Sequence, residues 1–141
     1  MKNTKAGFTL IELLMVVIII GILAAIAVPK FVGLGKKTSI KAAIAEISVI
    51  GSALDRYEMD NQMFPTTEQG LRALIEKPAS SPAPKDWSGP YLSDDIKDPW
   101  DKPYQYRYPS QNGRIDYDLW SWGPDGTEGT EDDVTNWKKQ P

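Results

Sequence analysis

An apolar segment near the N-terminus constrains this chain most. Residues 13–28 are all apolar or glycine, and the only charge within residues 8–28 is Glu12. A run of about 20 such residues is long enough to span a bilayer as a helix. Residues 1–7 carry two lysines and no acid. The positive-inside rule therefore keeps them in the cytoplasm and places the C-terminus on the other side of the membrane.

Three interpretations of this segment compete. Residues 25–27 (Ala-Ile-Ala) resemble the cleavage site of a secretory signal, which would remove the apolar run. The run could also be a plain membrane anchor. In the third interpretation the chain is cleaved on the N-terminal side of the run, and the run stays on the mature protein. Glu12 favours the last, because a buried acid is costly in an apolar span unless it is paired. Cleavage after Gly7 would leave the α-amine of Phe8 one helical turn from Glu12, of the same or a neighbouring chain.

Composition narrows the range of chemistry. The 141 residues include no cysteine and no histidine, which excludes disulfides, thiolate catalysis, Cys-based zinc sites and the Ser-His-Asp triad. The formal charge of -3 is unlike the strongly basic character of most nucleic-acid binders, so we expect no nucleic-acid partner. Cleavage after Gly7 would remove Lys2 and Lys5 and so make the charge of the mature chain -5.

Gly-Phe-Thr-Leu-Ile-Glu at residues 7–12, followed by the apolar run and Pro29, resembles the N-terminal signature of type IV pilins and pseudopilins. The resemblance implies cleavage after Gly7 by a prepilin peptidase, N-methylation of Phe8, and a role for Glu12 in assembly. It also implies that residues 8–37, called the stem here, are kept in the mature protein as a helix that spans the membrane and later forms the core of a fibre.

A second helical pattern follows the stem. Apolar residues recur at steps of three and four over residues 40–57 and predict an amphipathic helix that packs on its own domain. Together the two patterns predict one helix over residues 9–60. Pro29 should kink it. We expect either a static bend or, in the polymer, local unwinding between Gly21 and Gly35.

The remaining body predicts short elements. A helix-start pattern at Thr66 or Thr67 predicts a helix over residues 69–77. Residues 78–90 are rich in proline and serine and predict an ordered or semi-ordered loop. Strands are expected at 104–108 and 115–122, joined by a turn that contains Asn-Gly. The tyrosines of the first strand are expected to form a small core and its rim.

Several further motifs are similar to the major pseudopilin of type II secretion systems. They are Phe-Pro-Thr-Thr-Glu-Gln-Gly-Leu at 64–71, Asp-Pro-Trp at 98–100, Pro-Tyr at 103–104, and the segment from Gly-Pro-Asp-Gly at 123–126 to Asn-Trp at 136–137. Asp101 departs from the family, which more often has glycine there, and this leaves the local turn in question.

The resemblance implies an α+β, type IV pilin-like fold, in which a long N-terminal helix packs on a small domain with a short antiparallel sheet and a calcium-binding loop. The expected parts are a leader at 1–7, the stem at 8–37, and a periplasmic domain at 38–141 that includes the second half of the helix.

Residues 116–133 hold seven acids and no lysine or arginine. The residues alone fit either a solvated acidic loop or a site for a hard cation such as calcium, which takes six to eight oxygen ligands. The spacing is not that of an EF-hand. The family resemblance implies structural calcium, with side-chain oxygens from Asp125, Asp132 and Asp133 and carbonyl oxygens from Trp122 and Thr127. The ion would replace the disulfide of other pilins.

The resemblance implies a structural subunit rather than an enzyme. The mature protein would polymerise into a periplasmic pseudopilus that pushes folded proteins through an outer-membrane secretin. Its expected partners are further copies of itself, minor pseudopilins, the prepilin peptidase, the inner-membrane assembly platform with its ATPase and, before assembly, the inner membrane. One alternative is a type IV pilin for adhesion, motility or DNA uptake. Another is a carboxylate enzyme that uses two of the loop acids.

Overall fold

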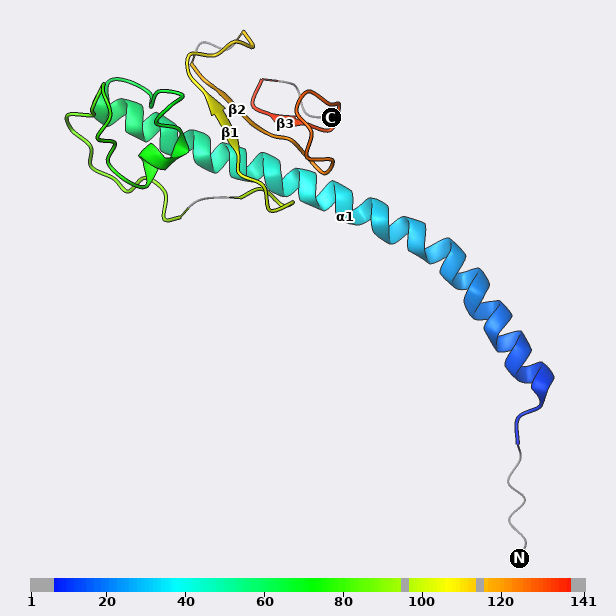
Figure 1. The fold of residues 1–141 in the computed structure, drawn as a ribbon. Helices are drawn as coiled ribbons and strands as arrows, with labels where there is room; N and C mark the ends of the chain where they lie inside the picture. Colours follow the sequence, from blue (N-terminus) through cyan, green and yellow to red (C-terminus); the bar gives the residue numbers. More distant parts are fainter. Residues whose placement is uncertain (1–6, 95–96, 114–115, 138–141) are drawn as a thin grey trace, which may run out of the picture. The chain divides into compact units, whose positions relative to one another are not determined.

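A computed structural model describes residues 7–94, 97–113 and 116–137, and within its long helix the side chains of residues 27–36 are not described. The predicted long helix is confirmed, because α1 runs over Leu10–Asn61, a length of 52 residues (Figure 1). Pro29 lies inside α1 without ending it. Unwinding between Gly21 and Gly35 in a polymer stays a prediction.

The chain divides into two compact units, unit 1 at Met1–Lys37 and unit 2 at Thr38–Pro141. Within unit 2, the apolar stripe predicted for residues 40–57 forms the helical side of the core. Its buried members are Ala43, Ile47, Ile50, Ala53, Leu54 and Tyr57. Fully burying one isoleucine or leucine side chain stabilises a fold by about 1.5–3 kcal/mol. The buried stripe therefore holds the second half of α1 to the rest of unit 2.

A three-stranded antiparallel sheet supplies the other side of the core, with strand order β1-β2-β3 (Figure 1). The strands are β1 at Gln105–Arg107, β2 at Asp118–Ser121 and β3 at Val134–Thr135. Tyr106 pairs with Leu119 across β1 and β2, and both side chains are buried in the core. The expected strands 104–108 and 115–122 are therefore present but shorter, and residues 114–115 lie outside the described part of the chain.

The tyrosines before and within β1 belong to the core, as expected. Tyr104 is 6% exposed and its Oη donates to Glu46 Oε2 on α1 at 2.6 Å. Tyr106 Oη donates to the carbonyl oxygen of Pro65 at 2.8 Å. Burial and the Glu46 carboxylate both raise the pKa of Tyr104 far above its ordinary value. The Tyr104 hydroxyl therefore acts as a neutral donor that bonds the segment before β1 to α1, and the Tyr106 hydroxyl bonds β1 to the segment that follows α1.

The helix predicted over residues 69–77 is wrong in kind and length. Thr66 and Gln69 form a reciprocal pair, in which Thr66 N donates to Gln69 Oε1 at 3.0 Å and Gln69 N donates to Thr66 Oγ1 at 3.2 Å. Gly70 then takes a φ of +58°, which interrupts a right-handed helix. Only a 3-10 helix follows, at Leu71–Leu74.

The expected ordering of loop 78–90 is supported by side-chain contacts. Gln69 Nε2 donates to the carbonyl oxygens of Ser80 and Pro82, each at 3.1 Å. Trp87 Nε1 donates to the carbonyl oxygen of Ala73 at 3.0 Å. Because these bonds reach back to the 3-10 helix and the turn before it, the loop is held to its own unit.

Candidate assembly surface and acidic loop

The described side chains of unit 1 present a continuous exposed apolar surface. Its large hydrophobic side chains between Phe8 and Ile26 are all at least 51% exposed, and Phe8 itself is 84% exposed. Exposed apolar surface of this extent marks a site for another protein or for lipid. Among the described residues, none of the helices meets the length and hydropathy needed to cross a membrane. Residues 27–36 of the predicted stem lie outside the described side chains.

Glu12 lies within this segment and caps the start of α1. The backbone N of Thr9 donates to Glu12 Oε2 at 2.9 Å, and Thr9 Oγ1 donates to the same oxygen at 3.0 Å. In return, Glu12 N donates to Thr9 Oγ1 at 3.3 Å. This is a capping box, in which a Thr and a Glu three residues later satisfy backbone donors of the first turn. The Thr-x-x-Glu spacing at residues 9–12 could have identified it.

Phe8 and Glu12 also share a groove. Both line a surface groove of about 490 Å³ on the first turns of the helix, together with Leu13, Met15, Val16 and Ile19. The residue that would carry the new α-amine after cleavage therefore lies on the same groove as the lone acid of the stem.

In unit 2, the acidic loop (residues 122–133) leaves β2 and returns to β3. Gly123 starts it with a φ of +67°, and a Cβ atom there would lie 2.2 Å from the carbonyl oxygen of Asp132. The two ends of the loop are therefore in backbone contact at Gly123, and only glycine fits this approach.

The base of the loop is fixed by a buried carboxylate from the Asp-Pro-Trp motif. Asp98 is 4% exposed, and its Oδ1 accepts from Trp100 N at 3.0 Å and from Lys102 N at 2.8 Å. Its Oδ2 accepts from Ser121 Oγ, which in turn accepts from Gly123 N at 3.0 Å. This chain of bonds positions the turn at Gly123, and sequence reasoning had not assigned Asp98 a role.

Asp101 shows how the turn next to this motif adapts. Its φ of +64° lies in the left-handed region that glycine adopts most easily, so the turn keeps a glycine-like conformation despite the substitution. Its exposed carboxylate accepts from Lys97 Nζ at 2.9 Å, which lowers the pKa of Asp101.

Three of the five predicted calcium-ligand residues gather around one hydroxyl. Thr130 Oγ1 lies 2.8 Å from Asp132 Oδ1, 3.4 Å from Asp133 Oδ1 and 3.3 Å from the carbonyl oxygen of Thr127. Carboxylate and carbonyl oxygens are the ligands that calcium prefers, so the residue types that gather at Thr130 suit a hard cation.

The other two predicted residues, Asp125 and Trp122, make different contacts. Asp125 is exposed, and its Oδ1 accepts from Thr127 N at 2.8 Å in a local turn. Trp122 is partly buried, and its Nε1 has no hydrogen-bond partner among the described atoms. No group of three or more acidic side chains with metal-binding geometry occurs among the described residues. The structure therefore places oxygens of Thr127, Asp132 and Asp133 around Thr130, whereas the Asp125 carboxylate is bonded to the amide of Thr127.

Another carboxylate, that of Asp118 at the start of β2, is fully buried. Burial opposes its ionisation, but hydrogen bonds from residues 110–112 outweigh that effect and lower its pKa. The donors are Ser110 Oγ at 2.5 Å, Gln111 N at 2.9 Å and Asn112 Nδ2 at 2.9 Å. Asp118 thus has a structural role in the turn, separate from the acidic loop.

Comparison with known proteins gives consistent results along the chain. Residues 30–137 match the family described as type II secretion system (T2SS), protein G, and residues 2–28 match the prokaryotic N-terminal methylation motif. The type II secretion system core protein G of Aeromonas hydrophila is 44% identical over 137 residues, which cover 96% of this chain and 94% of that protein. The protein of the same name from Pseudomonas aeruginosa is 44% identical over 140 residues, which cover 96% and 97%.

The fold has a solved counterpart. The crystal structure of the major pseudopilin from the type 2 secretion system of enterohaemorrhagic Escherichia coli matches with a TM-score of 0.68 and 40% identity, over 75% of this chain and 92% of that one. The pilin-like fold is thereby confirmed, and these relatives favour a pseudopilin over a type IV pilin. The chain belongs to the protein G family of type II secretion systems, whose members are structural pseudopilins.

Proposed function

We propose that this chain is the major structural subunit of a type II secretion pseudopilus. It is made as an inner-membrane precursor, cleaved after Gly7, methylated at Phe8, and added to a periplasmic fibre that helps push folded proteins through the secretin. The observation that carries this proposal is the exposed apolar surface from Phe8 to Ile26, in a chain of this family.

The stem needs two successive environments. Before assembly, lipid covers its apolar side chains, with the C-terminal domain on the periplasmic side. In the fibre, the stems of other copies replace the lipid. The prepilin peptidase acts on Gly7 and Phe8, and the assembly platform and minor pseudopilins act during polymerisation.

Glu12 serves two purposes in this proposal. It caps its own helix through Thr9, and its charge balances the α-amine of Phe8 on the same or a neighbouring copy. A carboxylate accepts several hydrogen bonds at once, so the two purposes are compatible.

Two substitutions separate these purposes. Glu12→Gln keeps an acceptor that completes a capping box but removes the charge. Thr9→Val keeps the charge but removes the hydroxyl of the cap. The assay is fibre formation by the processed protein, measured by shearing and sedimentation, with N-terminal mass spectrometry to confirm that both variants are cleaved.

The expected result is loss of fibres for Glu12→Gln and largely retained fibres for Thr9→Val. Normal fibres from cleaved Glu12→Gln would show that the charge is not needed. The ion-pair part of the proposal would then be wrong.

We also propose that the acidic loop binds calcium as a structural ion. Support comes from the oxygens of Thr127, Asp132 and Asp133 around the single hydroxyl of Thr130. Asp125 and the Trp122 carbonyl remain proposed ligands on the strength of the family resemblance. When bound, the ion would neutralise the loop and secure it between β2 and β3.

The test of calcium is thermal unfolding of the mature chain in detergent, with added calcium and with chelator. We expect a higher melting temperature in calcium, and loss of that difference in Asp132→Asn and Asp125→Ala. Glu131→Gln is the matched control, since it removes one charge from the same loop at an exposed position outside the ligand set. Equal melting temperatures of the unchanged protein in calcium and chelator would refute the site.

A further inference from the structure

The acidic loop receives a positive charge from another part of the fold. Its own sequence, residues 122–133, holds five acids and no lysine or arginine. Arg107 on β1 lies close enough to form an ion pair, since its Nη2 is 3.9 Å from Glu128 Oε1. The sheet therefore contributes a cation to a loop that would otherwise repel itself.

Strand register explains why Arg107 can reach the loop. Arg107 pairs directly with Asp118 on β2, which puts Trp120 diagonally across on the same face of the sheet. The guanidinium carbon of Arg107 lies 5.1 Å from the centroid of the Trp120 ring, a cation-π contact. Its Nη1 also donates to Gln111 Oε1 at 3.0 Å. Because Trp120 is only 6% exposed, it gives the guanidinium a fixed platform.

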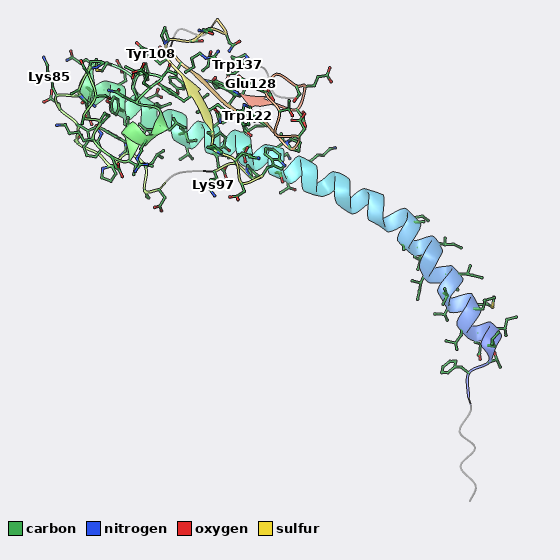
Figure 2. All side chains as sticks on the ribbon, viewed as in Figure 1. Lys85, Lys97, Tyr108, Trp122, Glu128 and Trp137 are labelled. Atoms are coloured by element: carbon green, nitrogen blue, oxygen red, sulfur yellow. The ribbon has the colours of Figure 1, made fainter. Side chains whose placement is uncertain are left out.

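The same side chains line a small open pocket of about 250 Å³. Its lining includes Arg107, Trp120, Glu128, Gly129, Asp133 and Trp137. Figure 2 labels Glu128 and Trp137 in the region beside β3. The N of Gly129 donates to Asp133 Oδ2 at 2.8 Å, so the part of the loop that Arg107 contacts is bonded directly to a proposed calcium ligand.

We propose that Arg107 is a positioning residue for the acidic loop. Supported by Trp120, it binds Glu128 and holds residues 127–129 in place. The Thr127 and Asp133 oxygens are thereby arranged before any cation arrives. The part of this inference that concerns calcium rests on the proposed function of the loop, whereas the part that concerns loop order does not.

An opposite effect has to be weighed against this one. A fixed positive charge near a cation site repels calcium, so removing it would tighten binding if the loop stayed in place. Exposed charges are strongly screened by solvent, and Glu128 is 58% exposed. Arg107 already neutralises part of the loop, and we expect the loss of loop order to outweigh the relief of repulsion.

The experiment uses the full mature chain in detergent with four substitutions. Arg107→Gln removes the cation, and Glu128→Gln removes the same ion pair from the loop side. Arg107→Lys keeps the charge but loses the planar group that stacks on Trp120. Lys102→Gln is the matched control, because the Lys102 Cε atom lies 3.6 Å from the Cβ position of Gly126 in the same loop, yet no ion pair joins it to an acid among the described residues.

Two measurements are made. Hydrogen exchange of the Gly129 amide in chelator reports loop order without metal, and calorimetric titration with calcium reports affinity. We expect Arg107→Gln to raise the exchange rate and to weaken calcium binding by about fivefold, the combined effect of an exposed ion pair and a cation-π contact. Glu128→Gln removes the ion pair alone, so its effect should have the same direction and be smaller. Arg107→Lys should be intermediate, and Lys102→Gln should match the unchanged protein in exchange.

The outcomes separate the two proposals. Exchange of Gly129 in Arg107→Gln equal to that of the unchanged protein overturns the positioning role, as does calcium binding that is equal or tighter. If the unchanged protein takes up no calcium, the calcium proposal fails, and Gly129 exchange alone then decides the role of Arg107. Should Arg107→Gln fail to fold, Glu128→Gln tests the same contact from the exposed side.

Discussion

Gly123→Ala is the substitution for which the structure gives the sharpest prediction. Two separate costs apply at this position. An L-residue at a φ of +67° costs about 1–2 kcal/mol relative to an ordinary conformation. The added Cβ would also lie 2.2 Å from the carbonyl oxygen of Asp132. Because both sides of this contact are backbone, the segment that carries Asp132 and Asp133 must move.

A second glycine in the same loop isolates the second cost. Gly129 has a φ of +87°, and a Cβ atom there would have no neighbour within 4 Å. Gly129→Ala therefore loses stability only through the unfavourable backbone conformation. Overpacking typically adds about 1–3 kcal/mol, so Gly123→Ala should be less stable than Gly129→Ala by about 2 kcal/mol. That difference corresponds to a melting temperature lower by roughly 8–16 °C.

Thermal unfolding of the two variants in detergent, each with calcium and with chelator, is the assay. Gly123→Ala should also lose any stabilisation by calcium, because the displaced segment carries two proposed ligands, whereas Gly129→Ala should keep most of it. Equal melting temperatures for the two variants would refute the argument that backbone contact at Gly123 closes the loop.

Three further substitutions test other parts of the account. Asp101→Gly should raise the melting temperature by about 2–4 °C, because relief of the left-handed conformation outweighs the exposed pair with Lys97; an unchanged or lower value in thermal unfolding would contradict this. The lowered pKa of Asp118 means that its contribution to stability is present above the unfolded pKa of about 3.9 and is lost as the pH falls through the still lower folded pKa. Asp118→Asn should therefore flatten the acid limb of a stability-against-pH curve measured with urea, and an identical limb would show that the carboxylate does not control it. Tyr104→Phe should cost about 1–2 kcal/mol in urea unfolding, since it leaves the Glu46 carboxylate without its donor, and no loss would mean that water replaces the hydroxyl fully.

The helical part of the fold could be predicted from the sequence because its periodicity is long. Residues 40–57 repeat the three- and four-residue spacing over five turns, and the core of unit 2 uses that stripe. Short elements were less predictable. The helix expected at 69–77 gave way to a 3-10 helix at Leu71–Leu74 because Gly70 takes a positive φ, which nothing in the local pattern required.

The site was predictable by residue type but not by arrangement. The acids of residues 116–133 stand out in the sequence, yet the sequence does not show that Thr130 would collect the Thr127, Asp132 and Asp133 oxygens while Asp125 turned to a backbone amide. The ion pair of Arg107 with Glu128 depends on the register of β1 on β2 and on the path of the loop that follows β2, neither of which the sequence specifies. The capping role of Glu12 was, by contrast, readable from Thr-x-x-Glu.

The central claim is that the stem stays on the mature protein so that copies can associate through it. Mass spectrometry of the N-terminus of the protein isolated from cells tests this most directly. The account predicts a chain that begins at Phe8 and carries one methyl group on its α-amine. A chain that begins at Val28, after removal of the apolar run, would contradict it.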